Sequence, residues 1–158
     1  MFIKDTPDER AEKFLRDVLD KMTLQSVEIE KSTDENAVEF NLSGEEVGFV
    51  IGRRGETLDA LQYLANLASA RKNVKGERDK SRVTIDIEGY RRKREETLRA
   101  LARKMAAKAI RNNRSVMLEP MNPYERRIIH SALQNDKYVA TKSEGEEPYR
   151  HVVVALKK

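Results

Sequence analysis

Hydrophobic residues change their spacing several times along the first 88 positions. Over residues 8–22 they recur every three or four positions, which predicts an amphipathic helix. Over residues 24–31 and 36–42 they alternate with polar residues, which predicts two half-buried strands. The segment "STDEN" between these strands is typical of a hairpin turn.

Two more helices and a third strand are predicted in the same part of the chain. The first helix is short, over about 44–51, and the second runs over 56–73 with a strong apolar stripe. That stripe consists of Leu58, Leu61, Leu64, Ala65 and Ala68. After the basic segment "RKNVKGERDKS", the alternation in "RVTIDIE" predicts a strand. The order is therefore helix, strand, strand, helix, helix, strand, and it is complete at residue 88.

A long helix over residues 90–112 opens the second part of the chain. Its predicted core stripe is Leu98, Leu101, Met105 and Ala109. "SVML" predicts a short strand, and "MNPYERRIIHSALQN" predicts another helix. In that helix Asn122 suits the N-cap, Pro123 the first helical position and Glu125 the third residue after the cap.

The chain ends in two further alternating segments, "KYVATKS" and "YRHVVVAL", which predict strands joined by the turn "EGEEP". The second part thus consists of a long helix, a short strand, a helix and a β-hairpin. We therefore expect an α+β protein with two small domains, residues 1–88 and 89–158.

The sign of the net charge also changes at residue 88. Residues 1–88 hold 14 basic and 19 acidic residues, a net charge of −5, whereas residues 89–158 hold 17 and 8, a net charge of +9. This asymmetry predicts a polyanionic partner for the second domain. The sequence has no cysteine and only two histidines, so we expect no metal and no cofactor. Because no apolar run reaches the roughly 20 residues of a membrane span, we expect no membrane insertion and a cytoplasmic location.

The segment Gly52-Arg53-Arg54-Gly55 lies between two predicted helices. Glycine permits positive φ angles and close approach of another backbone. The N–H groups at the start of the following helix attract phosphate, and the two arginines add charge and donors. These parts together can hold a nucleic-acid backbone, although a tight turn that happens to be basic is the alternative interpretation.

In its context, "VGFVIGRRGETLDALQYLANLAS" resembles the helix–loop–helix of a type II KH domain, with its "VIGxxG" signature. The resemblance covers about residues 8–88. It implies that the loop clamps about four nucleotides of a single strand, while bases lie in an adjacent apolar groove. The clamp would be Gly52, Arg53, Arg54 and Gly55. The groove would be walled by part of the last strand of this domain and by four residues that are first of all core, namely Val47, Val50, Ile51 and Leu58.

A second candidate site is the pair Arg126 and His130, which are four residues apart and about 40° from each other around a helix. Both would lie at the margin of the buried arc, with Arg127 further out. A histidine there is also compatible with a purely structural role at the edge of the core.

The surrounding segments, "LEPMNPYERRIIHSAL" and "VATKSEGEEPYRHVVV", resemble the single-stranded nucleic-acid-binding domain named for its Arg-x-x-x-His pair. The resemblance covers residues 89–158 and implies a basic face around this pair. That face would contain Arg126, Arg127 and His130, extended by Thr141, Lys142, Ser143 and Arg150. The two hydroxyl groups could instead stabilise the hairpin by bonding to local backbone.

The long helix is unusually basic, with ten cations between Arg91 and Arg114 against two acids, Glu95 and Glu96. This ratio is too biased for the cations to pair along the helix. Contact with backbone phosphates is therefore predicted, although a solvated helix face is the alternative.

Both domains in this order resemble the bacterial Jag family, the SpoIIIJ-associated proteins. This implies a non-enzymatic protein that binds single-stranded RNA, with single-stranded DNA as an alternative. Regulation or chaperoning of RNA, linked to cell elongation, division or sporulation, is implied by the family, as is a small KH-only partner protein. The sequence leaves the oligomeric state open, with a homodimer as one alternative. Many members carry a further N-terminal Jag domain, which the given sequence lacks, so we carry over none of its roles.

The alternative functions are an enzyme and a protein-interaction adapter. An enzyme is disfavoured because no P-loop motif is present, the glycines lack dinucleotide-binding spacing, and His130 has no carboxylate at an evident spacing. A protein-interaction adapter at the ribosome or division machinery, with reduced nucleic-acid binding, is the stronger alternative. The adjacent Arg53 and Arg54 argue against it, because a structural turn needs no pair of cations.

Overall fold

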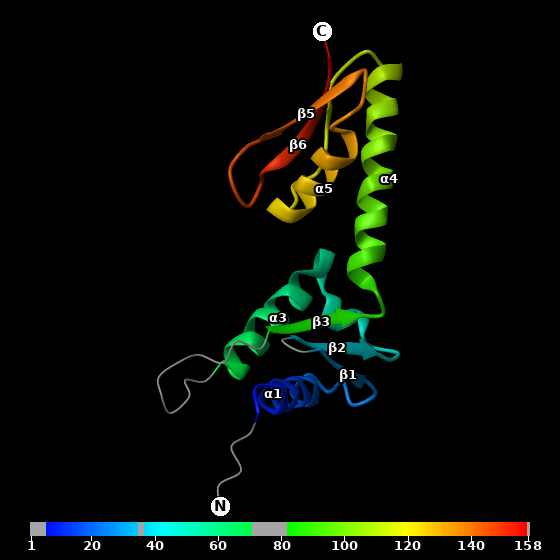
Figure 1. The fold of residues 1–158 in the computed structure, drawn as a ribbon. Coiled ribbons are helices and arrows are strands. Elements are labelled where there is room, and N and C mark those ends of the chain that lie inside the picture. Colours follow the sequence, from blue (N-terminus) through cyan, green and yellow to red (C-terminus); the bar gives the residue numbers. More distant parts are fainter. Residues whose placement is uncertain (1–5, 35–36, 71–81, 158) are drawn as a thin grey trace, which may run out of the picture. The chain divides into compact units, whose positions relative to one another are not determined.

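The computed structural model describes residues 6–34, 37–70 and 82–157. The chain divides into two compact units, Met1–Arg91 and Arg92–Lys158, and each is considered by itself (Figure 1). The division falls three residues after the sequence-based boundary at residue 88, within the first turn of the long helix.

Unit 1 has the predicted order of helices and strands. Its elements are α1 (Pro7–Lys21), β1 (Glu28–Asp34), β2 (Ala37–Ser43), α2 (Gly48–Ile51), a 3₁₀ turn η1 (Arg53–Gly55), α3 (Glu56–Ser69) and β3 (Arg82–Ile87). The sheet order is β1-β2-β3, with β1 antiparallel and β3 parallel to β2. The apolar faces of α1 and α3 pack against β2 and β3, and Phe40 is the largest fully buried side chain among the described residues.

Three local predictions for unit 1 were wrong. The first strand begins at Glu28 rather than residue 24, because Leu24 is buried in the turn before it. Residues 32–34 continue that strand instead of turning, and the rest of the expected turn lies outside the described residues. Leu64 is 47% exposed, because steps of three residues rotate about 60° backwards around a helix and carry it out of the buried arc.

Side-chain amides fix α3 against the outer edge of β3. Asn66 donates to the Val83 carbonyl and accepts from the Val83 N–H, at 2.7 and 3.0 Å. Gln62 Oε1 accepts from the Ile85 N–H at 3.0 Å. These bonds satisfy backbone groups that an edge strand leaves unpaired, and they hold the helix whose N-terminus follows the glycine-bracketed loop.

Unit 2 also has the predicted elements. They are α4 (Tyr90–Arg111, whose first two residues belong to unit 1), β4 (Val116–Met117), α5 (Pro123–Leu133), β5 (Val139–Glu144) and β6 (His151–Leu156). The sheet order is β4-β6-β5, entirely antiparallel. The core of α4 is narrower than expected, with Ala102 and Ala106 buried and Leu101 and Met105 only partly buried. These small side chains allow close packing of α4 on its neighbours.

Helix α5 begins as the sequence predicts. Asn122 is the N-cap, its Oδ1 accepts from the Glu125 N–H at 2.9 Å, and Pro123 is the first helical residue. The Glu125 carboxylate turns away from the cap and accepts from Arg94 Nε at 2.8 Å. The buried Glu125 therefore ties α5 to α4 rather than closing a capping box.

Within the described part of the chain, no helix is long and apolar enough to cross a bilayer. Residues 6–34, 37–70 and 82–157 also contain no group of three or more histidine, cysteine or carboxylate side chains that could hold a metal ion.

Candidate nucleic-acid interface

The loop from Gly52 to Gly55 reverses the chain between α2 and α3 through three left-handed residues. The φ angles are 69° at Gly52, 55° at Arg54 and 85° at Gly55. A Cβ atom at Gly52 would overlap the Thr57 hydroxyl, so glycine is required there by both conformation and space. Arg54 holds a conformation that few L-residues adopt outside strained or functional loops.

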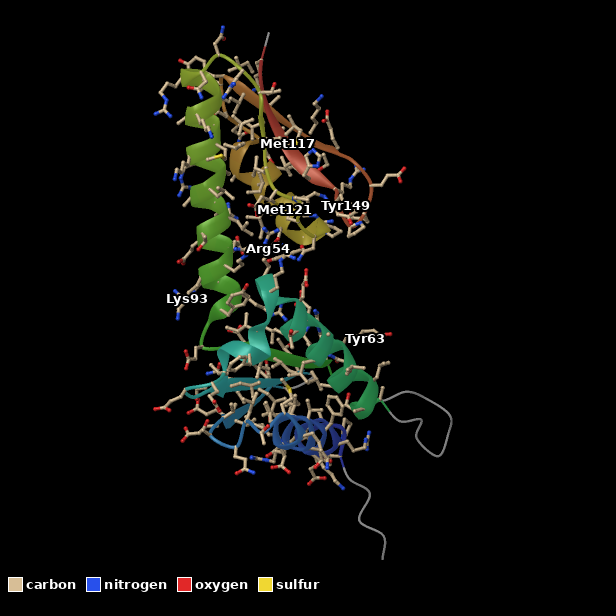
Figure 2. All side chains as sticks on the ribbon, turned by 180° about the vertical axis from the view of Figure 1, so that it is seen from behind. Arg54, Tyr63, Lys93, Met117, Met121 and Tyr149 are labelled. Carbon is tan, nitrogen blue, oxygen red and sulfur yellow. The ribbon has the colours of Figure 1, made fainter. Side chains whose placement is uncertain are left out.

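Helix α3 begins directly at this loop. Its N-cap is Gly55, which has no side chain to accept from the first backbone N–H groups of the helix. The Glu56 N–H donates to the Arg53 carbonyl, so a phosphate would be bound by the N–H groups that follow it, where the positive end of the helix dipole favours an anion. Arg53 is exposed, and Arg54, which is labelled in Figure 2, is half-buried in the same loop. The loop has the geometry and charge to hold a phosphate.

The expected apolar groove is mostly closed. Val50 and Leu58 are completely buried and Val47 is 6% exposed, because all three fill the core of unit 1. Only Ile51, which is half-buried, keeps accessible apolar surface among the four residues expected to wall the groove. Val47, Val50 and Leu58 therefore shape the loop from beneath.

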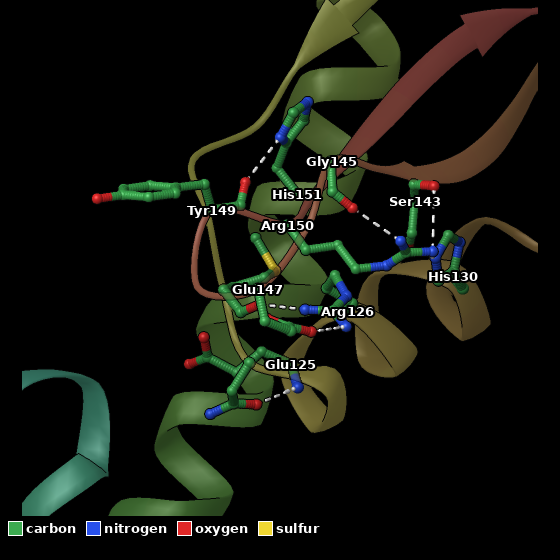
Figure 3. Close-up of polar contacts among 11 residues, drawn as sticks. Glu125, Arg126, His130, Ser143, Gly145, Glu147, Tyr149, Arg150 and His151 are labelled. Atoms are coloured by element: carbon green, nitrogen blue, oxygen red, sulfur yellow. Dashed lines mark hydrogen bonds and ion pairs between the residues drawn. The ribbon is translucent and has the colours of Figure 1, made fainter.

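Arg126 lies in the interior of unit 2, so its predicted position at a solvent margin was wrong. The residue is 7% exposed. Its Nη1 donates to the Met121 carbonyl and its Nη2 to Glu147 Oε1, each at 2.6 Å (Figure 3). Glu147 lies in the loop between β5 and β6, which folds over α5. The spacing of residues along α5 does not show that this loop buries Arg126, because the loop is distant in sequence.

His130 is held by two hydroxyl groups of β5. Its Nδ1 lies 2.6 Å from Thr141 Oγ1, and its Nε2 lies 2.8 Å from Ser143 Oγ. Burial, together with the nearby Arg126 charge, lowers the pKa of the His130 imidazole below its usual value of 6.5. The ring is therefore neutral at pH 7, and it orients the two hydroxyls that were expected to extend the face or bond to the hairpin backbone.

Arg127 is exposed beside His130. Both side chains line an open pocket of about 580 Å³ between α5 and β5. Its polar lining includes Arg127, His130, Gln134, Thr141 and Lys157. Lys157 was not singled out from the sequence, since nothing local distinguishes a lysine that follows the last strand.

Lys142 and Arg150 do not join this pocket. Residues of a strand alternate between its faces, so Lys142 lies on the opposite face of β5 from Thr141 and Ser143. There Lys142 forms an ion pair with Glu144 at 2.5 Å. Arg150 donates to the Gly145 carbonyl at 2.8 Å and holds the β5–β6 loop closed (Figure 3).

Helix α4 carries most of its cations on the side away from its buried alanines. Arg91, Arg94 and Arg99 form ion pairs with Asp59, Glu125 and Glu95, respectively. The exposed cations of the helix are Arg92, Lys93, Arg103, Lys104, Lys108 and Arg111. We call these six residues the α4 basic face.

Comparison with known families agrees with this arrangement. Residues 8–88 match the family described as "KhpA/KhpB, KH domain". Residues 96–156 match the domain family that is named for the Arg-x-x-x-His motif. Neither family is enzymatic.

Similar proteins align with most of this chain. "RNA-binding protein KhpB" of Clostridium symbiosum is 50% identical over 156 residues, which cover 98% of this chain and 68% of that protein. "RNA-binding protein KhpB" of Bacillus subtilis is 35% identical over 162 residues, covering 98% of this chain and 73% of that protein. The protein of the same name from Lactiplantibacillus plantarum is 39% identical over 119 residues, covering 75% of this chain and 36% of that protein.

Proposed function

This chain belongs to the KhpB, or Jag, family of proteins with a KH domain followed by an Arg-x-x-x-His domain, and from that premise we propose that it is a non-enzymatic protein that binds single-stranded RNA. The observation that supports this most directly is the loop from Gly52 to Gly55. Its left-handed backbone leads into a helix N-terminus without a side-chain cap, next to Arg53 and Arg54.

In the proposed complex the sugar–phosphate backbone lies against this loop. One phosphate accepts from N–H groups that follow Glu56 in the first turn of α3, and Arg53 and Arg54 contribute charge. Glycine at both ends of the loop permits the positive φ angles and the close packing against Thr57 and Tyr90 that shape the binding loop. Base contacts would be limited to the accessible part of Ile51, so we expect weak sequence preference from this unit.

The pocket of unit 2 would take a second segment of the same strand. Arg127 and Lys157 supply positive charge. The neutral His130 ring and the Thr141 hydroxyl beside it offer hydrogen bonds. Arg126 acts here by holding the loop in place rather than by touching RNA. The α4 basic face, Lys142 and Arg150 add charge near unit 2 that attracts phosphates without reading bases. Two linked sites raise the effective concentration of the second contact.

The decisive experiment compares RNA binding by the full chain and by the double variant Arg53→Asp with Arg54→Asp. We expect at least a roughly tenfold loss of affinity for a short single-stranded RNA, because two cations become anions at the clamp. A matched control, Lys13→Asp with Lys21→Asp, makes the same change in net charge at exposed positions of α1. Equal effects of the two double variants would contradict a local clamp.

We propose further that the protein acts in the cytoplasm as a regulator or chaperone of RNA in cell elongation, division or sporulation. The family resemblance supports this role. Crosslinking in cells, followed by sequencing of bound RNA, tests it: transcripts of unrelated function, without enrichment for these processes, would refute the link. A parallel arm with single-stranded DNA of the same sequence decides between the two nucleic acids.

An adapter function has one specific observation in its favour. The outer side of α3 exposes three large hydrophobic residues, Tyr63 (65%), Leu64 (47%) and Leu67 (54%). Such a patch on a soluble helix suits a protein partner, either a small KH-only protein or a second copy of this chain. Light scattering of the purified chain and of the variant Leu64→Glu distinguishes a homodimer from a chain that needs another partner.

A further inference from the structure

The clamp loop is supported by residues that lie between the two matched family regions. Tyr90 and Arg91 follow residue 88, where the KH match ends, and precede residue 96, where the match to the Arg-x-x-x-His domain begins. They form the first turn of α4 but belong to unit 1. Neither family comparison therefore assigns them to a site.

The ring of Tyr90 lies against Gly55. A Cβ atom built on Gly55 would be 2.9 Å from Tyr90 Cε1, and Gly55 itself is buried. Tyr90 is half-buried and also packs on the hydrophobic core of unit 1. The same aromatic ring thus contacts the core on one side and the last residue of the clamp loop on the other.

Arg91 joins this turn to α3 and β3. Its Nη1 donates to Asp59 Oδ1 at 2.7 Å and its Nη2 to Gln62 Oε1 at 3.4 Å. Its backbone N–H donates to Asp86 Oδ1 at 3.4 Å. The ion pair also balances the Asp59 charge in the first turn of α3, close to where a phosphate would bind.

A left-handed loop needs such support. A non-glycine residue in this conformation is strained, and it persists only when neighbouring structure holds it. Arg54 is in this conformation immediately before Gly55. Filling the space beside Gly55 with a rigid ring restricts the loop before RNA arrives, which lowers the entropy lost on binding.

We propose that Tyr90, assisted by Arg91, is a positioning residue of the RNA clamp, so that the first turn of α4 completes the binding site of the KH unit. This proposal rests on the proposed function of the loop. It assigns a role to the segment that otherwise only connects the two domains. Tyr90 touches the loop and not the RNA.

The first test measures RNA affinity for the full chain carrying Tyr90→Ala. We expect about tenfold weaker binding of a short single-stranded RNA, while the slope of log affinity against log salt is unchanged because no phosphate contact is lost. Tyr90→Phe keeps the ring and should bind within about twofold of the parent chain. The control Tyr138→Ala removes a tyrosine that is 65% exposed and belongs to no proposed site, and it should leave affinity unchanged.

A structural readout separates positioning from general destabilisation. In amide NMR spectra of Tyr90→Ala we expect shifts at Gly52 and Gly55, with α1 resonances unchanged. If this variant unfolds, Tyr90→Leu keeps apolar volume in the core but has no flat ring to support the loop, and the same readouts apply. Wild-type affinity together with unshifted glycine resonances in the folded variant would overturn the proposal.

A double-variant cycle addresses the contact itself. Gly55→Ala introduces a Cβ that meets the Tyr90 ring, in addition to strain from its positive φ angle. In the background of Tyr90→Ala only the strain remains, so the two effects should not add, and the double variant should bind no more weakly than Gly55→Ala alone. Strict additivity would contradict the contact. If the parent chain bound no RNA, or if Arg53→Asp with Arg54→Asp bound normally, the proposed function itself would fail instead.

Discussion

Arg126 and Glu147 form an ion pair of 2.6 Å that closes the β5–β6 loop over α5. The arginine side chain is 9% exposed and the glutamate side chain 53% exposed, so the pair joins a buried cation to a carboxylate on the exposed loop. Arg126 also donates a hydrogen bond to the Met121 carbonyl, which connects the segment before α5 to the same side chain. The arginine of the Arg-x-x-x-His motif thus connects three segments of unit 2, while His130 faces β5.

The first prediction concerns Arg126→Gln. We expect the free energy of unfolding to fall by about 1–3 kcal/mol, because the Met121 carbonyl and Glu147 lose a charged donor. The salt slope of RNA binding should stay unchanged, because Arg126 does not contact phosphate. Urea unfolding and affinity measurements across a salt series check both points.

Arg127→Gln is the matched variant for this prediction. It changes an exposed cation in the next position of α5 and should not alter stability. Its salt slope should fall by about 0.7, the value for one phosphate contact on a single strand. If Arg126→Gln reduced the slope equally, the buried arginine would have to reach the RNA after all.

The second prediction concerns the pH dependence of stability through His130. Burial and the Arg126 charge lower the pKa of the folded-state imidazole below 6.5, so the unfolded chain binds more protons in the range below 6.5. Stability from this group is complete above about pH 6.5 and is lost as the pH falls towards the folded-state pKa. Between pH 8 and pH 5 the free energy of unfolding should fall more for the parent chain than for His130→Gln, as unfolding curves at several pH values measure.

NMR titration of His130 gives a separate check on the cause. In Arg126→Gln the pKa of this imidazole should rise, because a neighbouring positive charge is removed. The effect of burial remains in that variant. If the pKa of His130 were the same in this variant, burial alone would account for its lowering.

The third prediction concerns the hydroxyl partners of His130. Thr141→Val removes the oxygen that lies 2.6 Å from Nδ1 while keeping the shape of the side chain. We expect a loss of about 1–2 kcal/mol in the free energy of unfolding, since one imidazole nitrogen loses its partner. Lys142→Ala, at the neighbouring position on the other face of β5, should change stability far less. Equal losses would show that the strand, rather than the imidazole contact, is responsible.

The fourth prediction concerns the α4 basic face. Lys104→Glu with Lys108→Glu should weaken RNA binding and reduce its salt slope, because two exposed cations that attract phosphates are reversed. Glu96→Lys, an exposed position on the same helix, should strengthen binding. Electrophoretic mobility shifts at several salt concentrations measure both changes, and circular dichroism verifies that the helix is intact. Unchanged affinity in both variants would leave this face as a solvated surface.

Several features of the site could be predicted from the sequence because they depend on residues close together in the chain. Asn122 and Pro123 start α5 through contacts within one turn, and the spacing of Leu58 and Leu61 already placed α3 on the core. Leu64 shows the limit of such reasoning. Successive residues three positions apart rotate steadily around the helix axis. Which of them are buried therefore depends on how wide the contact between helix and sheet is.

The sequence alone determined the order of elements, the two domains and the glycine-bracketed loop, because periodicity, caps and glycine conformations are set by residues close together in the chain. Tertiary structure decided that Arg126 is buried beneath Glu147, that β5 hydroxyls hold His130, and that Tyr90 lies against Gly55. Each of these contacts joins segments 11 or more residues apart. Local spacing does not encode them, since they arise only when the sheets and helices pack.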